Sequence, residues 1–310
     1  MTPLRIAIVG TGAHMREHLL PTLRALPGVQ IAAVASRDGT HAAELVTELG
    51  AGRSYAGWES ALESGVDGVV VAGPPSLHAA VARAALEARV PIYIEKPPAP
   101  DLAVLDDLIA AEERSGGLAF VGYNFRFARL VVKMRASIAA PRYLRLRFVT
   151  AKPLAPLWDL PSVDASYLYA VAVHPLEAAI NLFGSIRAVT GGLCPLGGAR
   201  FAAYAAIAFN SGAAALLDLG NCGSRFDCHW QLVGHGGAVA VVDDFERLHC
   251  NGGGDAITIE DRDAGRGYGE ALAAFAECIR ERRPSPSPLS ASRPVYEAIQ
   301  MLLDCWRGRD

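Results

Sequence analysis

The chain has 310 residues, of which 51% are hydrophobic, and a formal net charge of −3. This length accommodates two domains, and the nearly balanced charge gives no reason to expect nucleic-acid binding. No apolar stretch reaches the roughly 18–20 residues that cross a bilayer, and no leader precedes the first predicted strand, so we expect a cytoplasmic protein. The six cysteines form no CxxC pair, which favours reduced thiols and predicts no metal site.

The first predicted element is a strand that runs into a glycine turn. The apolar residues 6–9 lead to Gly10-Thr11-Gly12, and a helical pattern follows. Backbone N–H groups of such a turn and the helix dipole bind a pyrophosphate, and glycine lets the phosphates approach closely. The third glycine of the usual fingerprint is replaced by Met15, which must displace the helix or fill a gap. The pattern therefore predicts a dinucleotide site.

A second strand is predicted over 29–35, and its end indicates which dinucleotide is bound. The acidic residue that would bond the ribose 2′-hydroxyl of NAD is replaced here by Ser36, followed by Arg37. Serine can bond a 2′-phosphate and arginine can pair with it, so NADP is preferred to NAD. In the alternative interpretation Arg37 is a solvated loop residue and Asp38 caps the next helix.

Three further strands are predicted, over 66–72, 91–95 and 118–123, and they alternate with helices. We expect a helix through residue 88 capped by Ser76, and another over 102–113 capped by Asp101. Strands that alternate with helices predict an α/β fold with a doubly wound parallel sheet of the Rossmann kind. The predicted dinucleotide-binding domain covers residues 1–122.

The regular alternation of predicted strands and helices ends after residue 126. Alternating apolar runs predict strands, and longer amphipathic runs predict helices. The predicted strands lie at 143–150, 200–209, 213–220, 229–237 and 238–244, and the predicted helices at 130–138, 165–183, 268–282 and 293–307. Gly184 should end the second of these helices, and the glycines at 252–254 should form a surface turn. The second domain, residues 123–310, is therefore expected to be α+β with a largely antiparallel open sheet.

Lys96 stands directly after the predicted strand 91–95. Ligands of open α/β sheets collect at the carboxyl ends of the strands, so this amine is placed to reach a substrate. Carbonyl reduction by hydride needs a proton donor, and an ammonium supplies one. To act reversibly near neutral pH, the pKa of the lysine should fall from about 10.4 to roughly 7–8.

The stretches GTGAHMREHLLP, DGVVVAGPPSLHAAVARAAL, VPIYIEKPPA and VGYNFRF, in this order, resemble the Gfo/Idh/MocA oxidoreductase family. The resemblance extends to YGEALAAFAECIRERRPSP near the end of the chain. It implies that Lys96 lies against both substrate and nicotinamide, and that the peptide before Pro97 is cis. It also implies a sugar, polyol or related carbonyl substrate, and assembly into dimers or tetramers.

The match weakens in the second domain, where the family's helix carries an Asp four residues before a His. His174 falls on the family's histidine and Glu177 on the following acidic position, but Ala170 replaces the Asp. Tyr167 could supply a phenol to the same pocket, and Glu177 could orient the imidazole. In the alternative interpretation His174 is a core histidine beside Pro175.

The resulting hypothesis is an NAD(P)-dependent oxidoreductase with Lys96, His174 and Tyr167 as its catalytic residues. The candidate cofactor-binding residues are Gly10, Thr11, Gly12, Ala13, His14, Ser36, Arg37, Gly73, Pro74, Pro75, His78, Glu95, Lys96 and Asn124. Two alternatives stay open: a catalytically silent dinucleotide-binding sensor, and an imine reductase or redox-assisted lyase. We expect a small-molecule substrate and self-association, with no nucleic acid or membrane partner.

Overall fold

The structure is a computed structural model that describes residues 2–251, 257–258 and 265–308. It divides into two compact units: unit 1 comprises 1–123 and 268–293, and unit 2 comprises 124–267 and 294–310. The two units are therefore not consecutive stretches of chain, unlike the predicted 1–122 and 123–310, because the chain returns to unit 1 at 268–293. The glycines at 252–254 lie outside the described residues.

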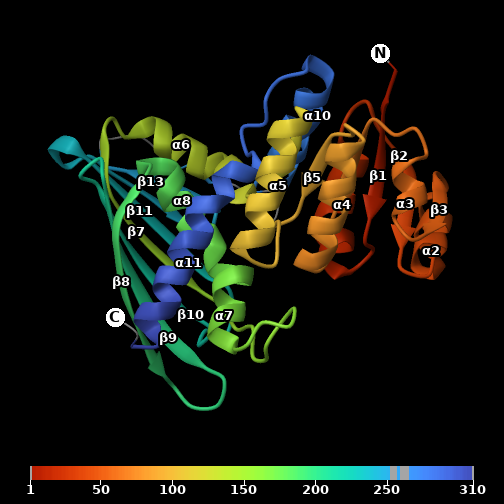
Figure 1. The fold of residues 1–310 in the computed structure, drawn as a ribbon. Helices are drawn as coiled ribbons and strands as arrows, with labels where there is room; N and C mark the ends of the chain where they lie inside the picture. Colours follow the sequence, from red (N-terminus) through yellow and green to blue (C-terminus); the bar gives the residue numbers. More distant parts are fainter. Residues whose placement is uncertain (1, 252–256, 259–264, 309–310) are drawn as a thin grey trace. The chain divides into compact units, whose positions relative to one another are not determined.

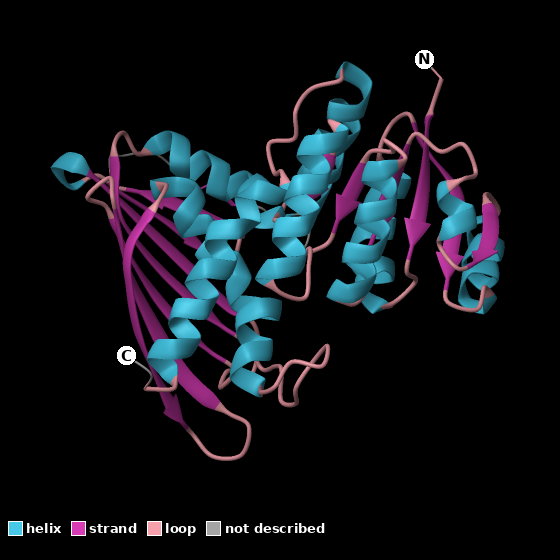
Figure 2. Ribbon diagram, in the orientation of Figure 1, coloured by secondary structure: helices cyan, strands magenta, loops and turns pink. Residues whose placement is uncertain are grey.

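Unit 1 is built on a six-stranded sheet in the order β3-β2-β1-β4-β5-β6 (Figures 1 and 2). All its neighbouring strands run parallel. The strands are β1 (Leu4–Val9), β2 (Val29–Ser36), β3 (Arg53–Ala56), β4 (Gly68–Val71), β5 (Ile92–Ile94) and β6 (Ala119–Val121). The predicted doubly wound sheet is confirmed. The strand order reverses between β1 and β4, which is where such sheets bind ligands.

The strands of unit 1 form because most of their residues are apolar and can be buried on both faces. Every residue of β4, β5 and β6 is buried. The edge strand β3 was missed because its four residues are mostly exposed and carry no apolar run.

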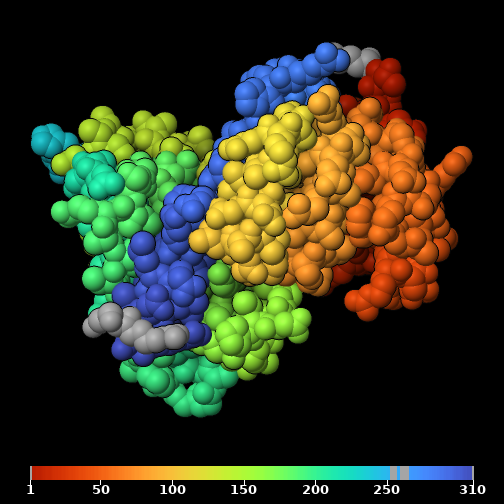
Figure 3. Space-filling model, viewed as in Figure 1, coloured from red at the N-terminus to blue at the C-terminus, as the bar shows by residue number. Residues whose placement is uncertain are grey.

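Helices pack against this sheet, and in the space-filling view α4 and α5 form a continuous part of the unit's surface (Figure 3). The helical segments are η1 (Met15–Leu19), α1 (Leu20–Ala25), α2 (Thr40–Leu49), α3 (Glu59–Leu62), α4 (Pro75–Glu87), α5 (Leu102–Ser115), α10 (Tyr268–Glu281) and η5 (Leu289–Ser292). The Asp101 cap is confirmed, since its carboxylate accepts from Val104 N at 2.8 Å. The Ser76 cap is wrong: α4 already begins at Pro75, a residue suited to the first helical position.

Glu112 of α5 joins three elements of unit 1. Its carboxylate accepts from Ala119 N and from Leu289 N, each at 3.2 Å. Burial raises the pKa of this carboxyl to about 7, against the opposing effect of the two N–H bonds. The protonated and ionised forms of this carboxyl are therefore comparably populated in the folded protein near neutral pH.

This carboxyl predicts a pH dependence of stability. Because the folded pKa lies above the unfolded value of 4.5, the folded state binds the proton more tightly, and stability falls as pH rises from 4.5 to about 7. We expect Glu112→Gln to remove about 1–2 kcal/mol of that fall, after allowance for partial exposure. Urea unfolding of both proteins at pH 5 and pH 7.5 measures the difference; parallel pH dependences would contradict the prediction.

Unit 2 contains an eight-stranded sheet in the order β14-β13-β12-β11-β7-β10-β9-β8. Only the β7–β10 pair is parallel among the pairs of the described residues, so the predicted largely antiparallel sheet is confirmed. The strands are β7 (Pro141–Val149), β8 (Ile186–Pro195), β9 (Phe201–Phe209), β10 (Ala214–Gly220), β11 (Asp227–Gly234), β12 (Val239–Asp243), β13 (Arg247–Cys250) and β14 (Ile257–Thr258). Strands β8, β13 and β14 were not predicted from the sequence.

One face of this sheet is covered by helices (Figure 1). The helical segments are η2 (Asn124–Phe127), α6 (Arg129–Ser137), α7 (Val163–Tyr167), η3 (Leu168–Ala172), α8 (Val173–Phe183), η4 (His235–Gly237) and α11 (Arg293–Trp306). The predicted helix 165–183 contains a π-helical stretch, η3, between α7 and α8, and ends at Gly184 as expected. No helix in the described part of the chain combines the length and apolarity of a membrane-spanning segment.

Candidate dinucleotide site and the Lys96 loop

The glycine turn after β1 has one position that only glycine can occupy and one that opens outward. Gly10 has φ +90°, and a Cβ there would lie 2.0 Å from the Ala72 carbonyl oxygen. This close approach joins the ends of β1 and β4. A Cβ at Gly12 would meet nothing within 4 Å, so this side of the turn is open to a ligand.

The helix after the turn accommodates Met15 without leaving it in solvent. Met15 is fully buried and begins the π-helical segment η1. The side chain therefore fills a gap in the core, the second of the two outcomes predicted for a bulky residue here. π-helical turns inside helices occur frequently at functional sites.

A cavity of about 470 Å³ opens at the carboxyl ends of β1, β2 and β4. Its lining comes from the glycine turn, the end of β2, the β3–α3 loop and the loop after β4. The lining residues are Val9, Gly10, Thr11, Gly12, Ala35, Ser36, Arg37, Asp38, His41, Gly57, Trp58, Ala72, Gly73, Pro74 and Leu77. Trp58 and His41 were missed in the sequence, since Trp58 follows an unpredicted strand and His41 had no motif around it.

The polar groups at the end of β2 also hold the start of α2. The Ser36 hydroxyl accepts from Ala42 N at 3.1 Å, and Asp38 Oδ1 accepts from Thr40 N at 3.0 Å. The bond from Thr40 N lowers the pKa of the exposed Asp38 carboxyl. Asp38 thus binds the first residue of α2, whose N-cap is Gly39 and not Asp38, while the exposed Arg37 lines the cavity.

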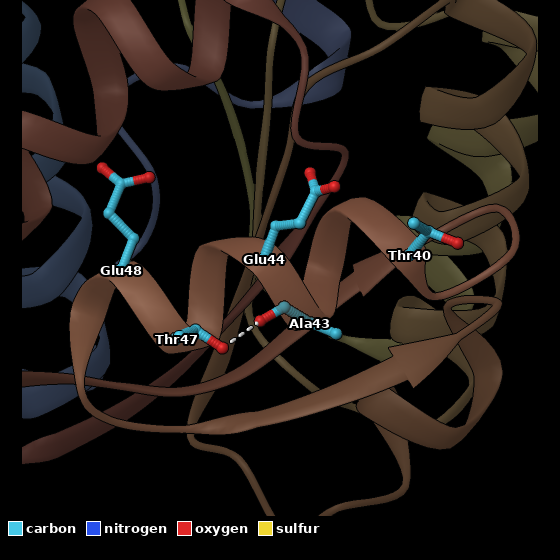
Figure 4. Close-up of a pocket in the computed structure, with 5 residues that line it drawn as sticks. All are labelled: Thr40, Ala43, Glu44, Thr47 and Glu48. Carbon is cyan, nitrogen blue, oxygen red and sulfur yellow. Dashed lines mark hydrogen bonds between the residues drawn. The ribbon is translucent and has the colours of Figure 1, made fainter.

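A second hollow, of about 650 Å³, lies along α2 and is lined by Thr40, Ala43, Glu44, Thr47 and Glu48 (Figure 4). All five belong to one helix, and Thr47 Oγ1 donates within that helix to Ala43 O at 2.9 Å. Because no other element contributes a group to it, we assign this surface no site.

His78 of α4 forms hydrogen bonds with the loop after β4 and with the loop after β5. Gly73 N donates to its Nε2 at 2.8 Å, so the proton of the neutral ring is on Nδ1, which donates to Pro97 O at 2.9 Å. The ring is 1% exposed, and burial lowers its pKa to about 4. His78 is therefore neutral at physiological pH and holds the Lys96 loop in place.

Lys96 follows β5 and is half-buried, and the Lys96–Pro97 peptide is cis, as predicted. Its backbone N donates to the Glu95 carboxylate at 3.3 Å. Glu95 is 3% exposed, and its Oε2 lies 3.4 Å from His14 Nε2. Burial alone would raise the pKa of Glu95, but electrostatic attraction to His14 and Lys96 brings it below its usual value.

In unit 2, His174 is buried and stacks on Phe125, with ring centroids 4.3 Å apart. Glu177, three residues further along α8, forms a buried ion pair with Arg126. Burial raises the pKa of Glu177, opposed by the charges of Arg126 and Arg135. The carboxylate proposed to orient His174 is therefore engaged by arginine, and Ala170 lies in η3 rather than in a regular α-helical turn.

Tyr167 is a correction to the predicted catalytic set. Its hydroxyl donates to Phe148 O at 2.7 Å and accepts from Gly220 N at 2.9 Å, and its ring is fully buried. Burial raises the pKa of the phenol further above its ordinary value. The side chain joins α7 to β7 and β10, so we remove it from the catalytic proposal.

We expect Tyr167→Phe to destabilise the fold by about 1–3 kcal/mol, because Gly220 N–H is left unpaired in the core. The turnover number should stay within about twofold of wild type, since no catalytic proton is lost. Urea unfolding and steady-state rates measure the two effects. A large loss of rate with unchanged stability would restore Tyr167 to the catalytic set.

Asn124 is fully buried in unit 2, where its Nδ2 donates to Arg266 O at 3.0 Å. Tyr123 is buried in unit 1 and donates to Ser292 Oγ at 3.0 Å. The contact of Asn124 with a cofactor stays a prediction. Of the other candidates, Ala13 lies in the first turn after the glycines and Pro75 begins α4. Among the residues that the structure describes, no group of three or more His, Cys, Asp or Glu could hold a metal ion.

The residues at the carboxyl ends of β1, β2 and β4 fit a dinucleotide. A glycine turn with an open face leads into a helix, and the adjoining cavity continues to the end of β2, where no acidic residue occupies position 36. This strand order together with such a turn defines the dinucleotide-binding Rossmann class.

Comparison with known proteins shows which family the first unit resembles. Residues 4–123 match the Gfo/Idh/MocA model, described as an oxidoreductase family with an NAD-binding Rossmann fold. The resemblance seen in the sequence is confirmed over these residues, which make up less than half of the chain.

Curated relatives match parts of the chain. An uncharacterized oxidoreductase, ORF334, of Rhizobium meliloti is 34% identical over 117 residues, which are 37% of this chain and 35% of that protein. UDP-N-acetylglucosamine 3-dehydrogenase of Acidithiobacillus ferrooxidans is 32% identical over 195 residues, covering 61% of this chain and 58% of that protein. The matches thus span between about a third and three fifths of these relatives' own length.

Solved structures match over nearly the whole chain. A dehydrogenase from Chromobacterium violaceum has a TM-score of 0.93 at 28% identity, covering 99% of this chain and 96% of that one. The structure of the Acidithiobacillus ferrooxidans UDP-N-acetylglucosamine 3-dehydrogenase has a TM-score of 0.84 at 25% identity, covering 100% and 99%. The second unit therefore shares its fold with these proteins as well.

Proposed function

We propose that this protein is an NAD(P)-dependent oxidoreductase acting on a sugar, a polyol or a related carbonyl compound, with Lys96 as its proton donor and acceptor. The observation that carries the proposal is that Lys96 and the open glycine turn lie at the same, carboxyl end of one parallel sheet. The family match and the relative named as a UDP-sugar dehydrogenase support it.

The proposed chemistry divides between the cofactor and the chain's own side chains. When bound, the nicotinamide would supply or accept the hydride at the reacting carbon. The Lys96 ammonium donates a proton to the oxygen that gains negative charge, and the neutral amine removes it in the reverse direction. His78 fixes the loop that carries Lys96. The assisting role of His174 stays a prediction.

We propose NADP as the preferred cofactor, because Ser36 and Arg37 line the cavity where an acidic residue would favour NAD. Arg37→Ala is expected to weaken NADPH binding roughly tenfold or more, about 1.4 kcal/mol, and to leave NADH binding nearly unchanged. Fluorescence titration with each cofactor measures both affinities. Equal losses for NADPH and NADH would show that Arg37 does not read the 2′-phosphate.

Self-association through the open face of the unit 2 sheet is also proposed. Across this face a row of paired positions contains Asp243, His229, Arg147, Asp218 and Tyr204. The rows beside it carry half-exposed Leu, Val and Ala side chains. Half-exposed apolar side chains beside such a polar row are commonly covered by another protein surface. A second copy of the chain would cover it in a dimer or tetramer, and the cytoplasmic location stays part of the proposal.

The experiment for the proposed function is a substrate panel. Purified protein with NADPH or NADH should consume reduced cofactor in the presence of one or more sugar ketones, and oxidised cofactor with the matching alcohols. Cofactor binding without turnover across sugars, polyols, imines and nucleotide sugars would favour the sensor. Deuterium uptake from solvent without net cofactor change would favour the redox-assisted lyase.

A further inference from the structure

Two adjacent residues of η2 contact two residues one turn apart on α8. The Phe125 ring stacks on His174, with ring centroids 4.3 Å apart and planes at 26°. The next residue, Arg126, forms an ion pair with Glu177, and its Nε donates to Glu177 Oε1 at 2.9 Å. A second guanidinium nitrogen of Arg126 donates to the same oxygen. The short segment η2 is thus attached to α8 at two points.

The ion pair between Arg126 and Glu177 is largely closed off from water. The arginine side chain is 13% exposed and the glutamate side chain 2%. Removing one partner of such a pair leaves an uncompensated buried charge, so the two side chains are held to each other. Charge-assisted N–H bonds are short and directional. The pair therefore determines where η2 lies along α8.

The apolar contacts of Phe125 do not make this choice. Phe125 is 5% exposed, and its ring centroid lies 4.5 Å from that of Phe245 and 6.5 Å from that of Trp230. Apolar burial is non-directional, so these contacts keep the ring in the core without determining which turn of α8 it faces. The directional contact beside it, between Arg126 and Glu177, sets that position.

We infer that Arg126 and Glu177 are positioning residues for His174: their ion pair holds η2 on α8 so that the Phe125 ring lies against the imidazole and limits its rotation. The inference rests on the part of the proposed function in which His174 assists the reaction. An assisting group must be held in one orientation, and a displacement of about 1 Å can cost roughly 100-fold in rate. Glu177 then acts on His174 through η2.

The first test needs no turnover and uses the cofactor-free protein. The ring current of Phe125 shifts the NMR resonances of imidazole protons that lie over its face upfield. The His174 resonances are assigned by their loss in His174→Gln, and Phe125→Leu gives their position without the ring current. We expect the double variant Arg126→Met/Glu177→Leu to lose most of the upfield shift. This variant should fold, because replacing both buried charges by apolar side chains of similar volume is often neutral for stability.

The matched control is Arg135→Met, which removes an arginine of α6 that also attracts Glu177 but leaves η2 unchanged. It should keep the full ring-current shift of His174. Arg126→Lys retains the buried positive charge without the planar guanidinium, so it should fold and lose part of the shift. An unchanged His174 shift in the Arg126 variants, or an equal loss in Arg135→Met, overturns the inference.

The second test separates positioning from stability. With the best substrate of the panel, the double variant should have a kcat about 10–100-fold below wild type, with a urea-unfolding midpoint close to that of wild type. Arg135→Met should keep kcat within about twofold. A wild-type kcat in the double variant overturns the inference. A wild-type kcat in His174→Gln would instead overturn the assisting role of His174 in the proposed function.

Discussion

Replacing Lys96 by methionine is expected to lower kcat roughly 100-fold to 10,000-fold, the usual contribution of a positioned acid or base. Methionine keeps the length and apolar stem of the side chain but cannot carry a proton. The Lys96 loop should persist, because His78 holds it through the backbone oxygen of Pro97 and not through the lysine side chain. Steady-state rates with the best substrate of the panel measure the loss.

The control for this variant is cofactor affinity. We expect the Kd of NADPH for the Lys96→Met protein to lie within about threefold of the wild-type value. Loss of a proton-transferring group lowers the rate of the chemical step without changing the binding of the cofactor. An equal fall of affinity and rate would assign Lys96 to binding. A kcat of the Lys96→Met protein equal to that of wild type would contradict the proposal that this amine exchanges the proton.

Gly10→Ala is expected to destabilise unit 1 by about 3 kcal/mol or more, from the positive φ and the overpacking together. Its Cβ would lie 2.0 Å from the Ala72 carbonyl oxygen, so β1 and β4 must separate. Dinucleotide binding should be lost with this local geometry. Thermal or urea unfolding measures the stability.

Gly12→Ala is the matched control in the same turn. Its Cβ meets nothing within 4 Å, so the fold should lose less than about 1 kcal/mol. The added methyl group still occupies the open side of the turn, and NADPH binding is expected to weaken about tenfold or more. If Gly10→Ala were as stable as Gly12→Ala, the close approach of β1 to Ala72 would not be needed for the fold.

The local features of the site were predictable because they depend on neighbouring residues. The glycine turn, the buried apolar strands and the Asp101 cap each have a short-range signal. The prediction that Ser76 caps α4 was wrong because Pro75, one residue earlier, also suits the start of a helix. Strand β3 was not predicted because its four residues, three of them exposed, carry no hydrophobic periodicity.

The partners of charged and polar side chains were not predictable in the same way. Glu177 was expected to serve His174 from the same helix, yet it pairs with Arg126 of another element. Tyr167 was expected in a pocket, yet its hydroxyl bridges two strands. Side-chain partners from distant segments leave no periodic trace in the sequence, so helical spacing alone suggested the wrong ones.

By itself, the sequence determined that this protein has a dinucleotide-binding half with an open glycine turn and a lysine after a buried strand, because those features follow from local backbone preferences and burial patterns. Only the tertiary structure decided that 268–293 joins the first unit, that Met15 fills its core and that His14 meets Glu95. The sequence indicates that an amphipathic helix or an imidazole must pack against or bind another group. Which group that is depends on the surfaces that the folded chain brings together.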